Sequence, residues 1–261
     1  MANQYTGRSE HELSLITVAE YRFLNNSLRN FMPGNFAGAE VGDLGEGGPP
    51  EYLATPDIWP RQGRALGFPS IDIEDENGYF PFPANLDDTI ADEEPFSVEL
   101  LTVPAWRGDP ALTTEVLAVM GDSNAANATG FGWRPDGRIA VAFGVATQTS
   151  ETAVWTFMDA PLHFLLTRAA GDDPVFSVMC NGSLVPFGNY QAGANGIADA
   201  TGMIFNWTDP AGNIHACYGH HFYLRVYNDV LTKPEQLWRY KQAQKMLANE
   251  KFPIPVWEDE A

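Results

Sequence analysis

Short runs rich in apolar, β-branched and aromatic residues recur along the 261-residue chain, and in some of them apolar and polar residues alternate. A period of two residues is typical of β-strands with one buried face. Such runs occur at 13–23, 95–103, 115–120, 131–144, 163–168, 175–180, 203–207 and 219–228. In the last run, Phe222, Leu224 and Val226 form an apolar face. The other face, which we expect to meet water or a ligand, consists of His221, Tyr223, Arg225 and Tyr227.

Turn sequences separate these runs and predict hairpins. Pro135-Asp136-Gly137 lies in the middle of the 131–144 run, and Asn181-Gly182 directly follows 175–180. Both are sequences that close tight turns between antiparallel strands. Residues 30–63 are too rich in glycine and proline for a regular element, so we expect a long surface loop there.

One helix is predicted near the end of the chain. Thr232 and Glu235 form a Thr-x-x-Glu capping box, and Pro234 fits the first helical turn. Apolar positions then recur at helical spacing at Leu237, Tyr240 and Leu247. Many strands with a single helix predict an all-β fold, an antiparallel two-sheet sandwich with one short C-terminal helix. We expect an N-terminal arm at 1–12, the sandwich at 13–248 and an extended tail at 249–261.

The charge balance excludes one class of partner. Acidic residues outnumber basic ones 34 to 15, which gives a formal charge of −19. Such a chain repels phosphate backbones, and no stripe of lysine and arginine reverses this, so we expect no nucleic-acid binding. The acidic residues are spread over several loops, as expected for solubility in a salty or crowded setting.

Other features bear on the compartment. No stretch reaches the roughly 18 consecutive apolar residues of a membrane span, so we expect no membrane insertion. The start, MANQYTGRSEHEL, lacks the pattern of a secretory signal, so we expect synthesis in the cytoplasm. Cys180 and Cys217 are the only cysteines, and reduced core thiols are favoured over a disulfide between them.

Several segments together resemble a known family. They include LITVAEYRF, GRALGFPSIDIEDENGYFPFP, HFLLTR followed by VFSVMCNGSLV, and CYGHHFYLRVYNDVLTKPEQLWRY. In this order they are similar to the laminin-G-like jelly roll of the concanavalin A-like lectin/glucanase superfamily, over residues 13–245. The last segment is the most specific, because a strand, Tyr-Asn, a leucine and a capped helix follow one another. The resemblance implies a jelly-roll sandwich that binds glycans or proteins at its loop rim, often with calcium.

A cluster of acidic residues lies within PSIDIEDENGYF, residues 69–80. Glucanases of the same superfamily carry Glu-x-Asp-x-Glu on one strand, and here Ser70 stands in place of the first glutamate. Asp72, Glu74 and Glu76 still alternate, so a glycoside hydrolase or lyase that uses them remains the alternative function. Calcium could instead be bound by four oxygen-bearing side chains: Asp72, Glu74, Asp75 and Asn77. A solvated loop is the favoured interpretation, because Asn77-Gly78 is a turn signal.

Aromatic residues offer a candidate ligand site. Flat rings stack on the apolar faces of sugars, and a platform could be built from Trp133, Trp207, His221 and Tyr223. Aromatic residues at alternating strand positions more often pack inside the protein, and that interpretation is favoured.

These features predict a non-catalytic recognition or structural module and not an enzyme. Strong acidity and the missing secretory pattern favour a component of a large assembly. The specific hypothesis is a bacteriophage virion surface protein, either a capsid decoration or a tail-associated protein. Its partners would be other protein subunits of that assembly and a cell-surface glycan.

Overall fold

The computed structural model describes residues 7–22, 51–54, 64–67, 79–81, 94–104, 115–120, 129–133, 136–143, 146–154, 161–170, 175–188, 202–204, 206–208, 214–216 and 219–249. In the first half of the chain these form α1 (Glu10–Ile16), β1 (Thr17–Arg22), β2 (Glu51–Ala54), β3 (Arg64–Gly67), β4 (Tyr79–Pro81), β5 (Phe96–Pro104), β6 (Glu115–Met120) and β7 (Thr129–Trp133). In the second half they form β8 (Ile139–Phe143), β9 (Ala146–Thr149), β10 (Leu162–Arg168), β11 (Phe176–Cys180), β12 (Ser183–Leu184), β13 (Gly202–Ile204), β14 (Asn206–Thr208), β15 (Ile214–Ala216), β16 (Gly219–Tyr227) and α2 (Lys233–Asn249).

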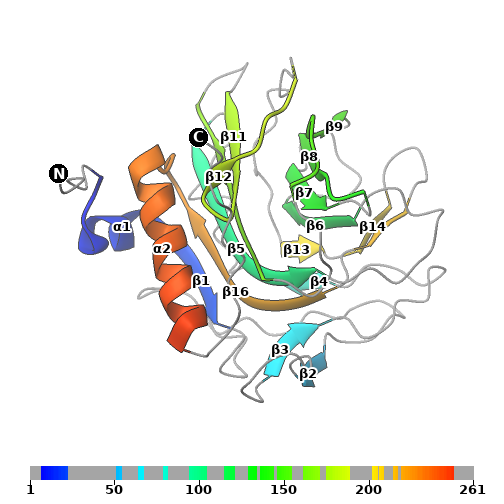
Figure 1. Cartoon of the computed structure of the whole chain (residues 1–261), viewed down its shortest axis with the longest axis horizontal. Coiled ribbons are helices and arrows are strands. Elements are labelled where there is room, and N and C mark those ends of the chain that lie inside the picture. The colour runs from blue at the N-terminus through cyan, green and yellow to red at the C-terminus, as the bar shows by residue number, and fades with distance from the viewer. Residues whose placement is uncertain are drawn as a thin grey trace.

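The strands form two large antiparallel sheets and one small ribbon. The first sheet has the order β12-β11-β10-β5-β16-β3-β2, and β1 also pairs with β16. The second has the order β4-β13-β6-β7-β8-β9, and β14 pairs with β15 in the ribbon. Figure 1 shows the two large sheets facing each other, with α1 and α2 on the outer side of the first sheet. The predicted antiparallel two-sheet sandwich is confirmed.

The core between the sheets follows the predicted alternation. Apolar side chains that point inward from the first sheet are at most 1% exposed: Phe96, Val98, Leu100, Phe164, Leu166, Val178, Phe222, Leu224 and Val226. Ile139 and Val141 of β8 are also fully buried. Burying an aliphatic or aromatic side chain contributes about 1.5–3 kcal/mol, so these residues supply much of the driving force for folding.

The opposite face of β16 differs from the expectation that it meets water or a ligand. Tyr223 and Tyr227 are only 3% and 1% exposed. The helices cover this face, where a buried cluster contains Leu13, Leu165, Met179, Tyr227 and Leu231, with Leu237 and Trp238 packed against it. Both sides of β16 are therefore buried, because α1 and α2 add a third layer to the sandwich.

The chain begins with a helix where the sequence predicted a strand over 13–23. Ser9 and Glu12 form a capping box: Ser9 Oγ accepts from the Glu12 N–H at 3.3 Å, and Glu12 Oε2 accepts from the Ser9 N–H at 2.7 Å. α1 therefore occupies 10–16, and the strand starts only at Thr17. The helix also crosses the predicted boundary between residues 12 and 13.

The predicted turns are confirmed. Asn181 and Gly182 have φ values of 48° and 82° and connect β11 to β12. Gly137, with φ 82°, lies between the paired strands β7 and β8. At position 182 a side chain has no room, because a Cβ would lie 2.5 Å from Tyr240 Cδ1. The turn and α2 are thus in direct contact.

The predicted C-terminal helix is also confirmed. α2 begins at Lys233, and Glu235 Oε2 accepts a hydrogen bond from the Thr232 N–H at 2.7 Å, as a capping box requires. Leu247 is 4% exposed and faces the core. Neither helix that the structure describes is both long and apolar enough to cross a membrane. Cys180 is buried and free, and Cys217 lies outside the described residues.

Candidate functional site

The two tryptophans of the predicted aromatic platform lie on two elements that both adjoin β6. Trp133 is the last residue of β7 and pairs with Glu115 of β6. Trp207 is the central residue of β14, and the β14–β15 ribbon lies beside β6. Both elements therefore have β6 as a neighbour, although they are far apart in the sequence.

The other two platform residues lie in the first sheet, on β16. A β-bulge interrupts the register between them: His221 pairs with Thr102, whereas Tyr223 pairs with Leu101. The bulge breaks the strict alternation from which the sequence grouped these two positions. Tyr223 is buried, and its hydroxyl donates to Glu99 Oε1 at 2.6 Å.

The acidic cluster lies outside the described residues. Asp72, Glu74, Asp75, Glu76 and Asn77 fall between β3, which belongs to the first sheet, and β4, which belongs to the second. The calcium site and the catalytic alternative that use these residues stay predictions. Among the residues that the structure does describe, no group of three or more acidic, histidine or cysteine side chains could hold a metal ion.

The most polar site that the structure describes is centred on a residue that sequence analysis missed. Glu99 lies in the middle of β5 with no exposed surface, on the face that α2 covers. Its carboxylate is held by side chains from β10, β16 and α2. Oε1 contacts Tyr223 Oη at 2.6 Å, His163 Nε2 at 3.0 Å and Arg225 Nη1 at 3.4 Å, and Oε2 contacts Tyr227 Oη at 2.6 Å and Arg239 Nε at 2.9 Å.

These contacts fix the charge on Glu99. Burial alone would raise its pKa, but the charge of Arg225 and the contacts with His163 and Tyr223 outweigh burial and lower the pKa to about 2. The same burial, together with the negative charge of Glu99, raises the pKa of Tyr223 and of Tyr227. At neutral pH the site is therefore a carboxylate that accepts hydrogen bonds from two neutral phenols and lies against two guanidinium groups.

This arrangement suits a structural role. A glycosidase acid needs a raised pKa, a route for the sugar and a second carboxyl group about 5–9.5 Å away. Glu99 is fully buried, and its lowered pKa keeps it ionised. Arg225 bridges it to Glu20, whose Oε1 lies 3.0 Å from Arg225 Nη2. The network therefore attaches α2 to the centre of the first sheet.

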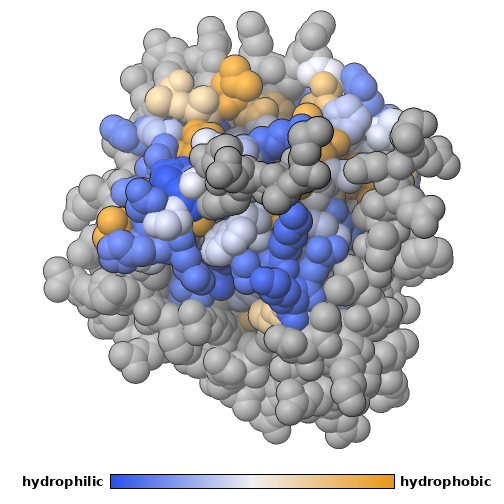
Figure 2. Space-filling model, turned by 60° about the vertical axis from the view of Figure 1, so that its left-hand side comes forward, coloured by the Kyte–Doolittle hydropathy of each residue, from blue (hydrophilic) through white to orange (hydrophobic). Residues whose placement is uncertain are grey.

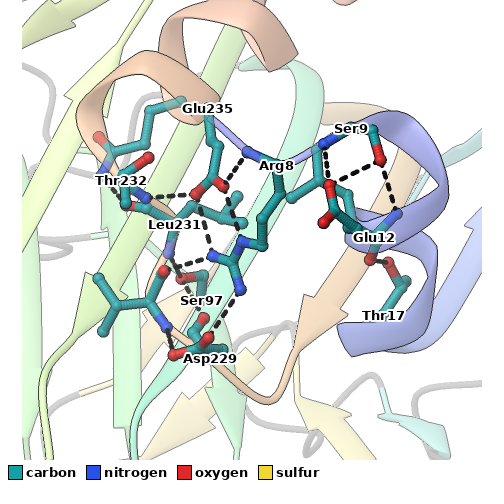
Figure 3. A network of polar contacts seen from close by, with 12 residues as sticks. Arg8, Ser9, Glu12, Thr17, Ser97, Asp229, Leu231, Thr232 and Glu235 are labelled. Atoms are coloured by element: carbon teal, nitrogen blue, oxygen red, sulfur yellow. Dashed lines mark hydrogen bonds and ion pairs between the residues drawn. The ribbon is translucent and has the colours of Figure 1, made fainter. Parts of the chain in front are cut away.

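A second polar cluster joins the N-terminal segment to the start of α2 (Figure 3). Arg8 donates from Nε to Glu235 Oε1 at 2.7 Å, from Nη1 to Asp229 Oδ2 at 2.7 Å, and from Nη2 to the Val230 carbonyl at 2.8 Å. The Arg8 backbone N–H also donates to Glu235 Oε1 at 2.8 Å. Burial opposes ionisation of Glu235, but its hydrogen bonds with Arg8 and Thr232 lower its pKa to about 2.

Replacing Arg8 with alanine is expected to lower the free energy of unfolding by about 1–3 kcal/mol, because Glu235 would lose its charged partner. Urea denaturation at neutral pH would measure this. Arg138 is a suitable control, since its side chain is 46% exposed and its ion pair with Asp136 is long, at 3.7 Å. Arg138→Ala should cost well under about 1 kcal/mol. Equal losses in the two variants would contradict a stabilising role for the Arg8 cluster.

No family model matches the sequence, and no curated protein matches it either. Similar folds are found among solved structures. Domain 4 of AbnA, a GH43 extracellular arabinanase from Geobacillus stearothermophilus solved in complex with arabinotriose, has a TM-score of 0.56 and 20% identity, over 85% of this chain and 96% of that one.

Two further structures are similar over more of this chain but less of their own. The binding domain of Paraclostridial Mosquitocidal Protein 1 has a TM-score of 0.55 and 13% identity, over 88% of this chain and 53% of that one. Trypanosoma rangeli sialidase, in complex with 2,3-difluorosialic acid, has a TM-score of 0.55 and 14% identity, over 89% of this chain and 34% of that one. At these identities the likeness is one of fold, and the class it defines is the antiparallel β-sandwich domain. The narrower laminin-G-like resemblance stays an interpretation of the sequence.

Proposed function

We propose that the chain is a non-catalytic recognition module whose β sandwich binds a neutral glycan. The observation that carries this proposal is the fold shared with domain 4 of AbnA, which was solved in complex with arabinotriose and is matched over 96% of its length. A fold by itself does not determine a function, so the proposal also needs residues that can hold a sugar.

Trp133 and Trp207 are the residues we assign to the sugar. Both come from elements that adjoin β6, on the side of the sandwich away from α2. Tryptophan rings provide the large flat apolar surface that stacks on a pyranose or furanose ring. Tyr223 is excluded from this role, because its hydroxyl belongs to the buried network around Glu99.

The charge of the chain favours a neutral sugar over an acidic one. With 34 acidic and 15 basic residues, the molecule carries a formal charge of −19. A sialylated or sulfated glycan would bring its own negative charge against a predominantly acidic chain, whereas a neutral oligosaccharide carries no electrostatic penalty. Screening of neutral and acidic oligosaccharides in parallel therefore tests the proposed ligand class.

Titration calorimetry with neutral oligosaccharides would test the site. Trp133→Ala and Trp207→Ala should each weaken binding by at least about tenfold, the loss expected when a stacked aromatic ring is removed. Trp133→Phe keeps an aromatic ring and should retain most of the affinity. Trp238→Phe is a control for position, because Trp238 packs beneath α2 on the opposite side of the first sheet. Wild-type protein that binds no neutral glycan would overturn the proposal.

Incubating the protein with the same oligosaccharides and analysing the products distinguishes the catalytic alternative from binding alone. A hydrolase or lyase would release shorter sugars from the oligosaccharide, and Glu74→Gln would abolish that release. A binding module releases none, and Glu74→Gln leaves its products unchanged. The glycan titration is repeated with added calcium and with a chelator. Binding that requires calcium would support an ion held by Asp72, Glu74, Asp75 and Asn77.

We also propose that the module is displayed on a bacteriophage particle, as a capsid decoration or a tail-associated protein. The support is the acidic composition, which suits a surface that stays soluble at high local concentration. Labelling purified particles with an antibody against this chain would locate it. Particles that carry no label, and that assemble equally well without the protein, would refute this assignment.

A further inference from the structure

We propose that the exposed face of α2 docks against an acidic surface of a second copy of this chain. All the lysines of the sequence lie at positions 233, 241, 245 and 251, within or just after this helix. Lys233, Lys241 and Lys245 are exposed on α2. In a chain with a formal charge of −19, this gathering of positive charge on one element is the strongest local departure from the overall composition.

The exposed face of α2 carries positive charge alone. Glu235 is the helix's only acidic residue, and its side chain is 1% exposed and held by Arg8. Arg239 is turned inward to Glu99. Lys241 and Lys245 are one turn apart, and Lys233 lies two turns before Lys241. At a rise of 1.5 Å per residue, the three lysines span about 18 Å along the helix.

Stability of the helix itself does not account for this placement. Cations stabilise a helix in its last turn and are unfavourable in its first turn, because of the helix dipole. Lys233 lies in the first turn, and the last turn contains no basic residue. Within the described part of the chain, none of the three lysines forms an ion pair with a carboxylate. With respect to the described residues, the lysines are therefore available to an external partner.

The surface chemistry identifies that partner as acidic protein. In Figure 2 the described residues in the middle of the face that bears the helices are mostly hydrophilic, so an apolar partner would gain little from them. A second copy offers abundant carboxylates, since acidic residues outnumber basic ones 34 to 15. A long polyanion such as nucleic acid would extend beyond the helix and meet the acidic remainder of the surface. A protein can contact the helix alone. At physiological salt, charges more than about 8 Å from that contact are largely screened.

The α2 faces of two copies repel each other, so α2 of one copy must meet a different surface of the next. The contact is either reciprocal, in a two-fold dimer where each α2 meets an acidic surface of the other copy, or head-to-tail, in a ring or filament. This geometry goes beyond glycan recognition and does not depend on it.

Sedimentation analysis at about 0.15 M salt, with protein at concentrations up to about 1 mM, would test the proposal. Wild-type protein should self-associate, and the triple variant Lys233→Glu, Lys241→Glu, Lys245→Glu should associate at least about tenfold more weakly. The triple arginine variant keeps the charges and should associate like the wild type. Glycan binding, measured in parallel, should be the same in all three proteins, so failure of one proposal is distinguishable from failure of the other.

A matched control separates a local contact from net charge. Lys241→Glu and Arg138→Glu change the formal charge equally, and Arg138 lies on the exposed turn between β7 and β8. Only Lys241→Glu should weaken association. Equal effects of these two variants would overturn the proposal, as would a wild-type protein that stays monomeric at every concentration. Lysine-dependent binding to anionic vesicles or nucleic acid without self-association would overturn it as well.

Discussion

Replacing Glu99 with alanine is expected to lower the free energy of unfolding by roughly 3–5 kcal/mol, the loss that follows removal of one partner from a buried ion-pair network. The carboxylate contacts five side chains from three elements, and all of them would lose their shared acceptor. Arg239 would remain as a buried cation, and two tyrosine hydroxyls would lack partners. Natural domains are stable by only about 5–15 kcal/mol, so this loss would be readily measured by urea denaturation at pH 7.

Two variants make the interpretation specific. Glu94→Ala removes an exposed glutamate two residues before β5 and should change stability by less than about 0.5 kcal/mol. Glu99→Gln keeps the shape and one acceptor oxygen but loses the charge, so its loss should fall between those of the other two variants. A loss below about 1 kcal/mol for Glu99→Ala would contradict the network, because no buried arginine could then depend on that carboxylate.

The parts of the fold that were predicted from the sequence depend on local signals. Asn181-Gly182 closes a hairpin because both residues adopt positive φ, a preference that their chemistry alone determines. Glu235 accepts from the Thr232 N–H because a capping box needs only four consecutive residues. The alternation of apolar residues likewise identified Phe222, Leu224 and Val226 as one buried face of β16.

The third layer could not be predicted in this way. Alternation shows that Tyr223, Arg225 and Tyr227 share a face, but not that α2 covers it. The signal was present in β5, where Glu99 is the one charged residue of the strand, yet its partners lie 64 to 140 positions away. At the N-terminus, the apolar run LSLIT fits a strand as well as a helix, and the Ser9–Glu12 capping box decides in favour of α1.

The candidate ligand site shows the same limit. β7, which carries Trp133, and the β14–β15 ribbon, which carries Trp207, both adjoin β6, a relation of topology that sequence spacing does not contain. The bulge between His221 and Tyr223 has no glycine or proline to announce it. Strict alternation, on which the grouping of these two residues depended, does not continue through the bulge.

Acidification from pH 4.5 to pH 2 is expected to remove most of the stabilisation that Glu99 contributes. Its pKa falls from 4.5 in the unfolded chain to about 2 in the fold. Because the folded-state value is the lower one, the contribution is complete above pH 4.5 and is lost as the pH falls towards 2. This difference between the two pKa values corresponds to a contribution to the unfolding free energy of at most about 3 kcal/mol. Glu235, whose folded pKa is also about 2, should lose its contribution over the same range.

The comparison of wild type with Glu99→Gln isolates this effect. Acidification also removes the mutual repulsion of a chain with a formal charge of −19, which opposes the loss and complicates any single curve. That background is shared by both proteins, so the difference between their unfolding free energies reports Glu99 alone. The difference should shrink by about 2–3 kcal/mol between pH 4.5 and pH 2 and stay constant above pH 5. If the unfolding free energies of the two proteins changed in parallel between pH 4.5 and pH 2, the pKa of Glu99 would be the same in the folded and unfolded chain. That result would contradict the buried ion pairs of Glu99.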